Sequence, residues 1–399
     1  MQGVVSRHPL KENRKMRGIY VHIPFCRKKC AYCDFYSVVG DRRAIDDFCA
    51  LLVREMDLFR EKFPGEAAAP ADTVFFGGGT PTVLGAEALC GLLSALRERF
   101  PIAKDAEVTT EANPGTVTAD DFHALKSGGF NRVSIGVQSF TPRTLRTLGR
   151  IHGVEEVRAA HRDARRAGFS SIGMDLIFGI PGQEIADWAD DLDRTVTFLP
   201  AHVSAYALAP EPGTPIHGAI GRGELQMPPD DVVAQMYEET RSALSRSGYR
   251  HYEISNYARS GSECRHNMKY WRREGTAGLG PSAHGLLFLS DKAPLGVRTA
   301  NPPSLADYRR RIVEGRLPWE DVHLCDPEDA WKESLIAGLR MLEGIDLKEI
   351  EKQAGPPPDA VRRAVESLLR AGRLQEEGSR LRLPAGLLFV SNEVLQALV

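Results

Sequence analysis

The chain has 399 residues, of which 42% are hydrophobic and 26% are charged. This composition is typical of a folded globular protein and excludes the disordered, collagen-like and small disulfide-stabilised classes. Its 51 basic and 53 acidic side chains give a formal net charge of −2, which argues against a dedicated binder of nucleic acid or polyphosphate. The length predicts two or three domains, or one large α/β barrel with an appended domain.

The first seventeen residues are polar and basic, without an apolar run, so we expect no secretory signal. We interpret residues 1–16 as a flexible N-terminal segment. The longest uncharged stretch, Thr195 to Pro210, is interrupted by Pro200 and is too short to span a bilayer. The cysteines number seven, and an odd number in a long chain argues against a disulfide framework. Together these features predict a cytoplasmic, thiol-reducing location.

Short β-branched runs alternate with longer amphipathic stretches up to about Pro210, a pattern typical of βα units around a parallel sheet. We predict six strands, at residues 18–23, 73–76, 106–110, 132–137, 171–177 and 202–207. Helices are expected between them, at residues 45–63, 86–100, 119–127, 154–167 and 185–198. The predicted fold class is therefore α/β.

Cys26, Cys30 and Cys33 follow the first predicted strand, in the run HIPFCRKKCAYCDFY. Three thiolates this close together suit an iron–sulfur cluster in which three irons take protein ligands and the fourth stays open. Zinc is the alternative, although structural zinc sites normally have four ligands in paired C-x-x-C hooks. Cys49 and Cys90 fall on predicted helices at apolar positions, where we interpret them as small core residues.

The regular pattern ends after Pro212, where Gly and Pro punctuate the chain up to a helix predicted at 230–247. Residues 249–303 have no regular pattern, and we interpret them as an irregular functional insert. Three helices, two short segments near Leu374 and Leu381, and a last helix ending at Val399 then predict a small helical domain with a β-wing. We divide the chain into a core at 17–229, an insert region at 230–317 and a helical domain at 318–399.

The spacing C-x-x-x-C-x-x-C, followed by Gly77-Gly-Gly-Thr-Pro81, resembles the radical S-adenosylmethionine (SAM) superfamily. Longer strings narrow the resemblance to its HemN-like branch: YVHIPFC, FFGGGTPT, TTEANPGT, RVSIGVQSF, LGRIHG, MDLIFGIPGQ, HYEISNYA, CRHNMKYW and GLGPSAHG. Within that branch the chain is similar to the HemW-like haem chaperones, which look like oxygen-independent coproporphyrinogen III oxidases. The resemblance implies a partial (β/α)6 barrel of the radical SAM type with a C-terminal, winged-helix-like domain.

The resemblance also implies the cofactors, a 4Fe-4S cluster on the three clustered cysteines and a SAM molecule beside it. Backbone groups of Gly78, Gly79 and Thr80 would lie against the methionyl group, since only small residues permit that approach. Glu111 would accept a hydrogen bond from its ammonium, and Arg150 would hold its carboxylate. Because the motifs follow the carboxyl ends of the predicted strands, these residues should meet at one rim of the barrel.

Five further positions are carried over from the branch. Gln138 and Asp175 would take the ribose hydroxyls of SAM. Tyr20, Tyr32 and the backbone near Ala209 would flank the adenine or a second SAM molecule. The alternative for each polar residue taken singly is a capping or surface role.

Two features favour the haem chaperones over the oxidases of the branch. The oxidases usually continue the motif as C-x-x-x-C-x-x-C-x-C and have a longer segment before the first strand, whereas Phe35 stands at the last cysteine position here. The string HNMKYW matches a motif that is associated with haem in HemW-like proteins. There His266 would be an axial iron ligand, with Cys264 as the alternative, and Tyr270 and Trp271 would pack against the macrocycle.

The function predicted is a haem chaperone that binds haem and passes it to an acceptor protein, with membrane-associated proteins among the candidates. A flavodoxin or ferredoxin would supply electrons, no residue is assigned as catalytic, and whether the chain is an enzyme stays open. Alternatives are an oxygen-independent coproporphyrinogen III oxidase, a radical methyltransferase and a haem-degrading enzyme of the same branch. A winged-helix nucleic-acid binder is the remaining alternative, although acidic residues lie among the C-terminal arginines and favour a solvated face.

Overall fold

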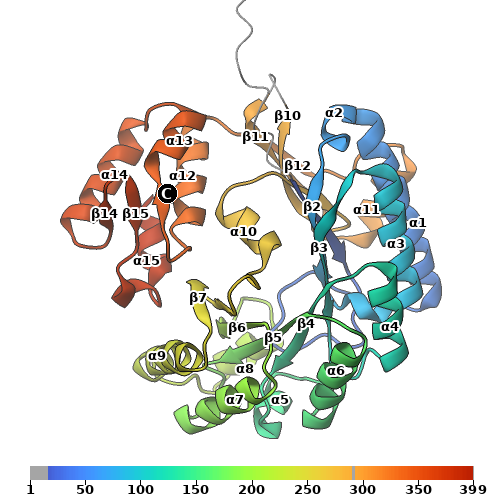
Figure 1. The fold of residues 1–399 in the computed structure, drawn as a ribbon, viewed down its shortest axis with the longest axis horizontal. Helices are drawn as coiled ribbons and strands as arrows, with labels where there is room; N and C mark the ends of the chain where they lie inside the picture. Colours follow the sequence, from blue (N-terminus) through green and yellow to red (C-terminus); the bar gives the residue numbers. More distant parts are fainter. Residues whose placement is uncertain (1–16, 290–292, 399) are drawn as a thin grey trace, which may run out of the picture.

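The computed structural model describes residues 17–289 and 293–398, so the N-terminal segment 1–16 and Val399 lie outside the described residues. Six strands form its centre (Figure 1): β1 (Arg17–Ile23), β2 (Ala71–Gly78), β3 (Ile102–Ala112), β4 (Arg132–Gln138), β5 (Ser171–Phe178) and β6 (His202–Ala207). Each pairs in parallel with the next, in sequence order. The six predicted strands and the α/β class are confirmed.

Helices cover the outer face of this sheet in Figure 1: α1 (Arg42–Lys62), α3 (Ala86–Arg99), α4 (Ala119–Gly128), α6 (Val154–Arg166) and α7 (Ile185–Thr197). Their apolar sides pack on the strands, and side chains such as Leu52, Leu93 and Phe122 are fully buried in one core with Val74 and Ile135. Shorter turns of helix join them, namely α2 (Pro64–Ala67), α5 (Pro142–Thr147), α8 (Pro215–Gly221) and a 3-10 turn at Pro81–Leu84.

The sheet continues beyond both edges of the six strands. On one side β9 (Thr276–Leu279) pairs in parallel with β1, and β10 (His284–Leu289), β11 (Ala293–Ala300) and β12 (Asp321–Leu324) follow antiparallel. On the other side β8 (Asn256–Ala258) pairs with β6, and β7 (Arg250–Glu253) pairs with β8. The twelve-stranded sheet has β12 and β7 at its ends, so the barrel is open.

The prediction that residues 249–303 are irregular is therefore wrong, because this stretch supplies five strands and the helix α10 (Arg265–Trp271). Three of the strands are too short to show a periodic pattern, with three residues in β8 and four in β7 and β9. Of these strands, β9 pairs with β1 and β8 pairs with β6, both far away in the sequence. The helices on either side of this stretch are α9 (Asp230–Arg246) and α11 (Leu305–Val313).

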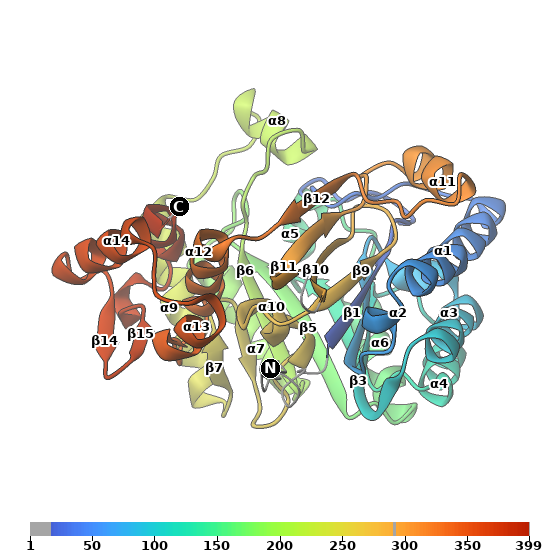
Figure 2. The ribbon, with the colours of Figure 1, turned by 90° about the horizontal axis from the view of Figure 1, so that it is seen from above.

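A C-terminal unit lies beside the barrel (Figures 1 and 2), with helices α12 (Pro327–Gly338), α13 (Leu347–Ala354) and α14 (Asp359–Arg370). Its small sheet joins β13 (Ile345–Asp346), β14 (Gln375–Glu377) and β15 (Arg380–Arg382), so the three helices and two short segments are found where predicted. The last predicted helix is divided into α15 (Ser391–Leu395) and a 3-10 turn at Gln396–Leu398, and another such turn lies at Ala385–Leu387. None of the described helices is long and apolar enough to cross a membrane.

Candidate functional site

A cavity of about 580 Å³ lies inside the barrel and reaches both ends of its strands. The cysteine loop after β1 closes the carboxyl end, and residues at the amino ends, such as Arg132 of β4 and His202 of β6, line the opposite end. The lining includes the following residues that the sequence singled out: Tyr20, Cys26, Cys30, Tyr32, Cys33, Gly78, Gly79, Thr80, Glu111, Gln138, Arg150, Asp175, Ala209, Cys264 and Tyr270. His266 and Trp271 are not among the lining residues.

Cys26, Cys30 and Cys33 are free thiols that line the carboxyl end of the cavity together. The Thr80 hydroxyl lies 3.5 Å from Sγ of Cys26, and Nη1 of Arg150 donates to Sγ of Cys30 at 3.4 Å. Among the described residues, no three His, Cys, Asp or Glu side chains converge on a point that would hold one metal ion. Three thiols at one rim suit a cluster, in which each thiolate binds its own iron.

The glycine loop at the end of β2 packs its backbone closely against neighbouring residues of the chain. This close packing leaves room for a ligand beside the loop. A Cβ added to Gly79 would lie 2.6 Å from the carbonyl oxygen of Phe25, and one added to Gly78 would lie 2.6 Å from the ring of His22. Gly78 also has a φ of 105°, which side chains rarely tolerate. Glycine at both positions therefore lets the loop lie against the cysteine loop, as a cradle for a small cofactor requires.

Two carboxyl groups, Glu111 on β3 and Asp175 on β5, face the cavity in buried surroundings. Burial and the charge of Asp175 raise the pKa of Glu111 to about 8. Burial also raises the pKa of Asp175, whose oxygens accept hydrogen bonds from Ser134 at 2.9 Å and from Ser204 at 2.7 Å. These surroundings favour a protonated Glu111, and a cationic ligand would favour its ionised form.

Arg150 is a positively charged side chain that hydrogen bonds hold in place at the cysteine end of the cavity. Its Nη2 donates to Oδ1 of Asn113 and to the carbonyl of Gly136, both at 2.7 Å, while its buried Nε has no partner among the described residues. Asn113 in turn donates to the Thr80 hydroxyl at 2.9 Å, which links the arginine to the glycine loop. A guanidinium held in this way, with a donor left over, suits a planar carboxylate.

Helix α10 lies between strands β1–β2 and the C-terminal helix α12 (Figure 1). It carries His266, whose ring is only 1% exposed and stacks on Phe75 at 5.3 Å. Nδ1 of His266 lies 2.9 Å from the Thr73 hydroxyl, and Nε2 lies 3.0 Å from the Tyr270 hydroxyl. Burial lowers the pKa of His266 to about 3, so the ring is neutral. As placed, His266 offers no free nitrogen to an iron.

The other residues expected at a haem face different surroundings. The Cys264 thiol lies 3.7 Å from Oε1 of Glu107, and burial raises its pKa to about 12. Tyr270 faces the cavity, whereas the Trp271 ring packs under the guanidinium of Arg340 at 4.7 Å. Cys264, His266, Tyr270 and Trp271 therefore do not form one face in this structure.

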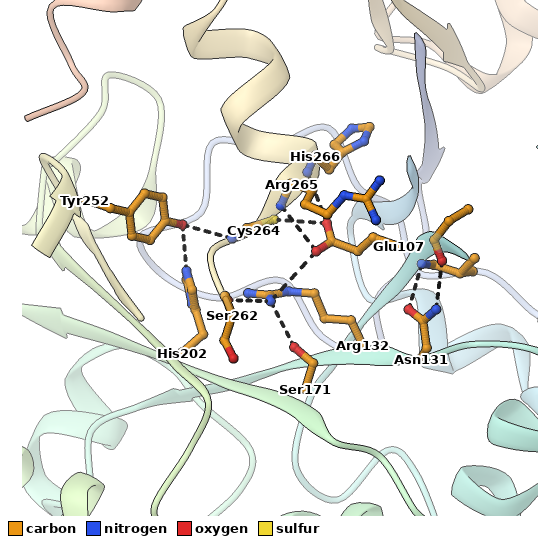
Figure 3. A network of polar contacts seen from close by, with 12 residues as sticks. Glu107, Asn131, Arg132, Ser171, His202, Tyr252, Ser262, Cys264, Arg265 and His266 are labelled. Carbon is orange, nitrogen blue, oxygen red and sulfur yellow. Dashed lines mark hydrogen bonds and ion pairs between the residues drawn. The ribbon is translucent and has the colours of Figure 1, made fainter. Parts of the chain in front are cut away.

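A polar network holds α10 at the amino ends of the strands (Figure 3). The Glu107 carboxylate of β3 accepts the backbone N–H of Arg265 at 3.2 Å and that of His266 at 3.0 Å. Arg132 lies 3.9 Å from the same carboxylate and donates to Ser171 at 2.9 Å. Figure 3 also shows His202, hydrogen-bonded at 2.8 Å through Nε2 to the hydroxyl of Tyr252, which accepts the Cys264 N–H at 3.3 Å.

Several residues of this cavity were not found by sequence reasoning. Asn113 connects Arg150 to Thr80, and Ser134 and Ser204 hold Asp175. A signal for Asn113 was present, since it lies in the string TTEANPGT two residues after Glu111. The two serines had no local signal, because each lies on a different strand from the aspartate that it contacts.

Comparisons with known proteins match two family models. One, described as the Radical SAM superfamily, covers residues 20–195. This range includes the cysteine loop and the strands β1 to β5. The other, described as the HemN C-terminal domain, covers residues 325–389. Together they cover five of the six central strands and most of the C-terminal unit, and residues 196–324 lie outside both matches.

Curated relatives match over nearly the whole chain. The protein named heme chaperone HemW of Mycobacterium tuberculosis H37Rv is 35% identical, over 96% of this chain and 94% of its own length. The proteins of the same name from Bacillus subtilis 168 and Escherichia coli K12 are 33% and 35% identical, over 96% and 90% of this chain and 99% and 92% of their own.

Among solved structures, coproporphyrinogen III oxidase (HemN) from Escherichia coli superposes with a TM-score of 0.81. The match covers 97% of this chain and 91% of that one at 24% identity. At that identity the likeness shows a common fold and does not distinguish an oxidase from a chaperone.

Proposed function

The chain belongs to the HemW family of the radical SAM superfamily, and from this premise we propose that it binds haem and delivers it to an acceptor protein. The superfamily implies a 4Fe-4S cluster and SAM as cofactors. An acceptor protein for haem and a one-electron donor such as a flavodoxin or ferredoxin complete the proposal. The observation that carries it is the full-length relationship to proteins named haem chaperones.

Phe35 supports a function as a haem chaperone over a function as an oxidase. It is 62% exposed, lines the mouth of the cavity and stands two residues after the last clustered cysteine. A phenyl ring there supplies no further thiolate and leaves an apolar surface beside the cysteine loop. The oxidase alternative expects cysteine at this position.

The three thiols fit the cluster, since they are free, share one rim and leave one iron position without a protein ligand. A cluster of this kind supplies an open coordination position and a source of single electrons. The protein's part is placement and charge: Arg150 donates to the Cys30 sulfur at 3.4 Å and would neutralise part of the cluster's negative charge.

The cavity also fits SAM. In the proposed arrangement Arg150 holds the carboxylate, Glu111 accepts a hydrogen bond from the amine, and Gly78, Gly79 and Thr80 allow the methionyl group to approach the backbone. Gln138 and Asp175 are proposed for the ribose hydroxyls, with Asp175 oriented by its two serines. Tyr20, Tyr32 and the backbone near Ala209 are proposed to flank the adenine or a second SAM molecule.

His266 does not present an axial ligand as it is placed, because its Nε2 lies 3.0 Å from the Tyr270 hydroxyl and its Nδ1 lies 2.9 Å from the Thr73 hydroxyl. The proposal of haem binding at the segment Cys264–Trp271 therefore includes the loss of the hydrogen bond to Tyr270. Tyr270→Phe frees the nitrogen and should strengthen haem binding, whereas His266→Ala should shift the Soret band and weaken binding. A thiolate-type spectrum in His266→Ala, lost on Cys264→Ala, would instead assign the ligand to Cys264.

The function is tested by anaerobic reconstitution with iron and sulfide, followed by haem titration and by transfer of the bound haem to an apo-haemoprotein. We expect cluster absorbance to disappear in Cys26→Ala, Cys30→Ala and Cys33→Ala and to persist in Cys49→Ala and Cys90→Ala. We also expect stable haem binding and transfer. Steady release of carbon dioxide from coproporphyrinogen III, with SAM and a reductant present, would overturn the chaperone in favour of the oxidase.

A further inference from the structure

Strand β4 ends in a strained turn at Gln138. This residue has a φ of 66°, in the left-handed region that non-glycine residues seldom adopt. The Ser139 N–H donates to the Val137 carbonyl at 2.9 Å, so the hydrogen bond closes around Gln138 alone. A hydrogen bond of this span around a residue with positive φ makes a γ-turn of the rare, strained hand. Such a turn persists only where the surrounding structure holds it.

Two buried side chains from other segments hold this γ-turn. Nε2 of His152, a residue 5% exposed, donates to the same Val137 carbonyl at 3.0 Å. Asp191 of α7, fully buried, accepts the Ser139 hydroxyl at 2.6 Å and the Phe140 N–H at 2.7 Å. Burial lowers the pKa of His152 to about 4, so the ring is neutral and keeps its proton on Nε2 to make this bond.

The γ-turn fixes the position of the Gln138 amide. Side chains two residues apart on an extended strand stand about 7 Å from each other. Here a Cβ added to Gly136 would lie 3.0 Å from Nε2 of Gln138, 2.9 Å from Oδ1 of Asn113 and 3.4 Å from Nη2 of Arg150. The Gln138 amide is thus folded over Gly136, beside the guanidinium proposed to hold the SAM carboxylate. The pairing register of β4 with β5 shifts at the same place, between Gly136 and Gln138.

We propose that His152 and Asp191 are positioning residues for SAM, because they hold the γ-turn that keeps the Gln138 amide beside Arg150. This inference rests on the proposed binding of SAM. Neither residue lines the cavity, and neither can touch a ligand there. Any effect of their substitution on SAM affinity must pass through the turn.

The first test compares two substitutions at His152 in the anaerobically reconstituted full-length protein. His152→Leu removes the donor to Val137, and His152→Gln keeps an N–H at the same end of the side chain. We expect the leucine variant to bind SAM about tenfold more weakly by calorimetry, and the glutamine variant to recover most of the loss. His251→Leu is the matched control, because His251 is also a neutral histidine that donates to a backbone carbonyl, that of Ile254, away from the turn.

Asp191 is tested in the same way. Asp191→Leu removes both acceptors of the γ-turn, whereas Asp191→Asn keeps one for the Phe140 N–H. We expect weakened SAM binding in the leucine variant and a smaller effect in the asparagine variant. Thermal unfolding of each variant separates this effect from a general loss of stability.

A double-mutant cycle shows whether His152 acts through Gln138. Gln138→Ala removes the amide, so His152→Leu should alter SAM affinity much less in that background. Gln138→Gly should also be more stable than Gln138→Ala, because glycine adopts a positive φ without strain. Unchanged SAM affinity in His152→Leu, or the same weakening with and without the Gln138 amide, would overturn the positioning role and leave the proposed function standing. A parent protein that does not bind SAM would overturn the proposed function and this inference together.

Discussion

At the scale of single residues, the cavity brings together ionisable side chains whose charges are only partly neutralised by other groups of the protein. Burial raises the pKa of both Glu111 and Asp175, and the charge of Asp175 raises that of Glu111 further, while Arg150 is held by neutral oxygens of Asn113 and Gly136. Buried groups in this condition gain most from a ligand of opposite charge. A zwitterionic ligand such as an amino acid group satisfies both at once.

The first prediction at this scale concerns a proton at Glu111. Its pKa of about 8 keeps the carboxyl mostly protonated at neutral pH, and an amine placed beside it favours the carboxylate. Binding of SAM should therefore release a proton, and affinity should rise with pH up to about 8. Calorimetry in phosphate and in Tris buffer measures the released proton through the difference in heat. Glu111→Gln should bind more weakly and release less proton, and equal proton release by parent and variant would contradict the assignment.

The second prediction concerns Arg150, which we place against the SAM carboxylate. A charge-assisted pair contributes about 1.5–3 kcal/mol, so Arg150→Ala should weaken SAM binding by roughly tenfold to a hundredfold. Arg150→Lys keeps the charge but cannot donate to both Asn113 and Gly136, and should recover only part of the affinity. Iron content and cluster absorbance should stay at parent levels, because Arg150 is not an iron ligand. Unchanged calorimetric affinity in Arg150→Ala would show that the role is wrong.

At the scale of elements, α10 is a short helix held in place by its surroundings. Seven residues form too little helix to be stable alone, and the Glu107 carboxylate accepts two of its first N–H groups. The same carboxylate faces Arg132 and the Cys264 thiol. Glu107 of β3 is thus one of the side chains that hold α10, and with it His266, in position.

Glu107→Ala should therefore destabilise the protein by about 3 kcal/mol, because it leaves the buried Arg132 guanidinium without its partner carboxylate. Glu107→Gln keeps an acceptor oxygen for the helix and should lose less. Urea unfolding measures both variants. Since α10 carries the proposed haem ligands, the alanine variant should also change the haem spectrum, and a spectrum and stability equal to those of the parent would argue against this role of Glu107.

At the scale of the whole molecule, Glu55 joins segments that are far apart in the sequence. The residue lies on α1, is 1% exposed and accepts hydrogen bonds from the Gly280 N–H at 2.8 Å, the Asn301 amide at 2.8 Å and the Tyr308 hydroxyl at 2.7 Å. These contacts connect α1 to the loop after β9 and to α11. One buried carboxyl group thereby connects the segments that follow β9 and β11 to the helical layer of the barrel.

The pH dependence of stability should report this group. Burial raises the pKa of Glu55 from 4.5 to about 7, so between these values the folded protein keeps a proton that the unfolded chain loses. The free energy of unfolding should therefore fall as pH rises from about 4.5 to 7, by about 3 kcal/mol at most. Glu55→Gln cannot titrate and should show a smaller fall. Urea unfolding of both proteins at several pH values measures the difference, and parallel curves would refute it.

Much of this protein could be predicted from local sequence. The six strands, the helices between them and the cysteine loop each depend on residues close together in the chain, through hydrophobic period, caps and motif spacing. The lining of one cavity by the cysteines, Glu111 and Arg150 follows in turn, because parallel strands bring their carboxyl ends together. The family relationship was inferred from the motif strings in the sequence.

Contacts between distant segments were decided only by the tertiary structure. The hydrogen bonds of His266 to Thr73 and of Asp191 to Ser139 join residues 193 and 52 positions apart, and no local pattern encodes them. The edge strands form because β1 and β6 offer unpaired backbone groups, a property of the folded sheet rather than of the added segments. For this reason the sequence alone predicted that the clustered cysteines, Glu111 and Arg150 surround one cavity, whereas packing determined that Ser134 and Ser204 join them, that His266 is buried and how Gln138 is held.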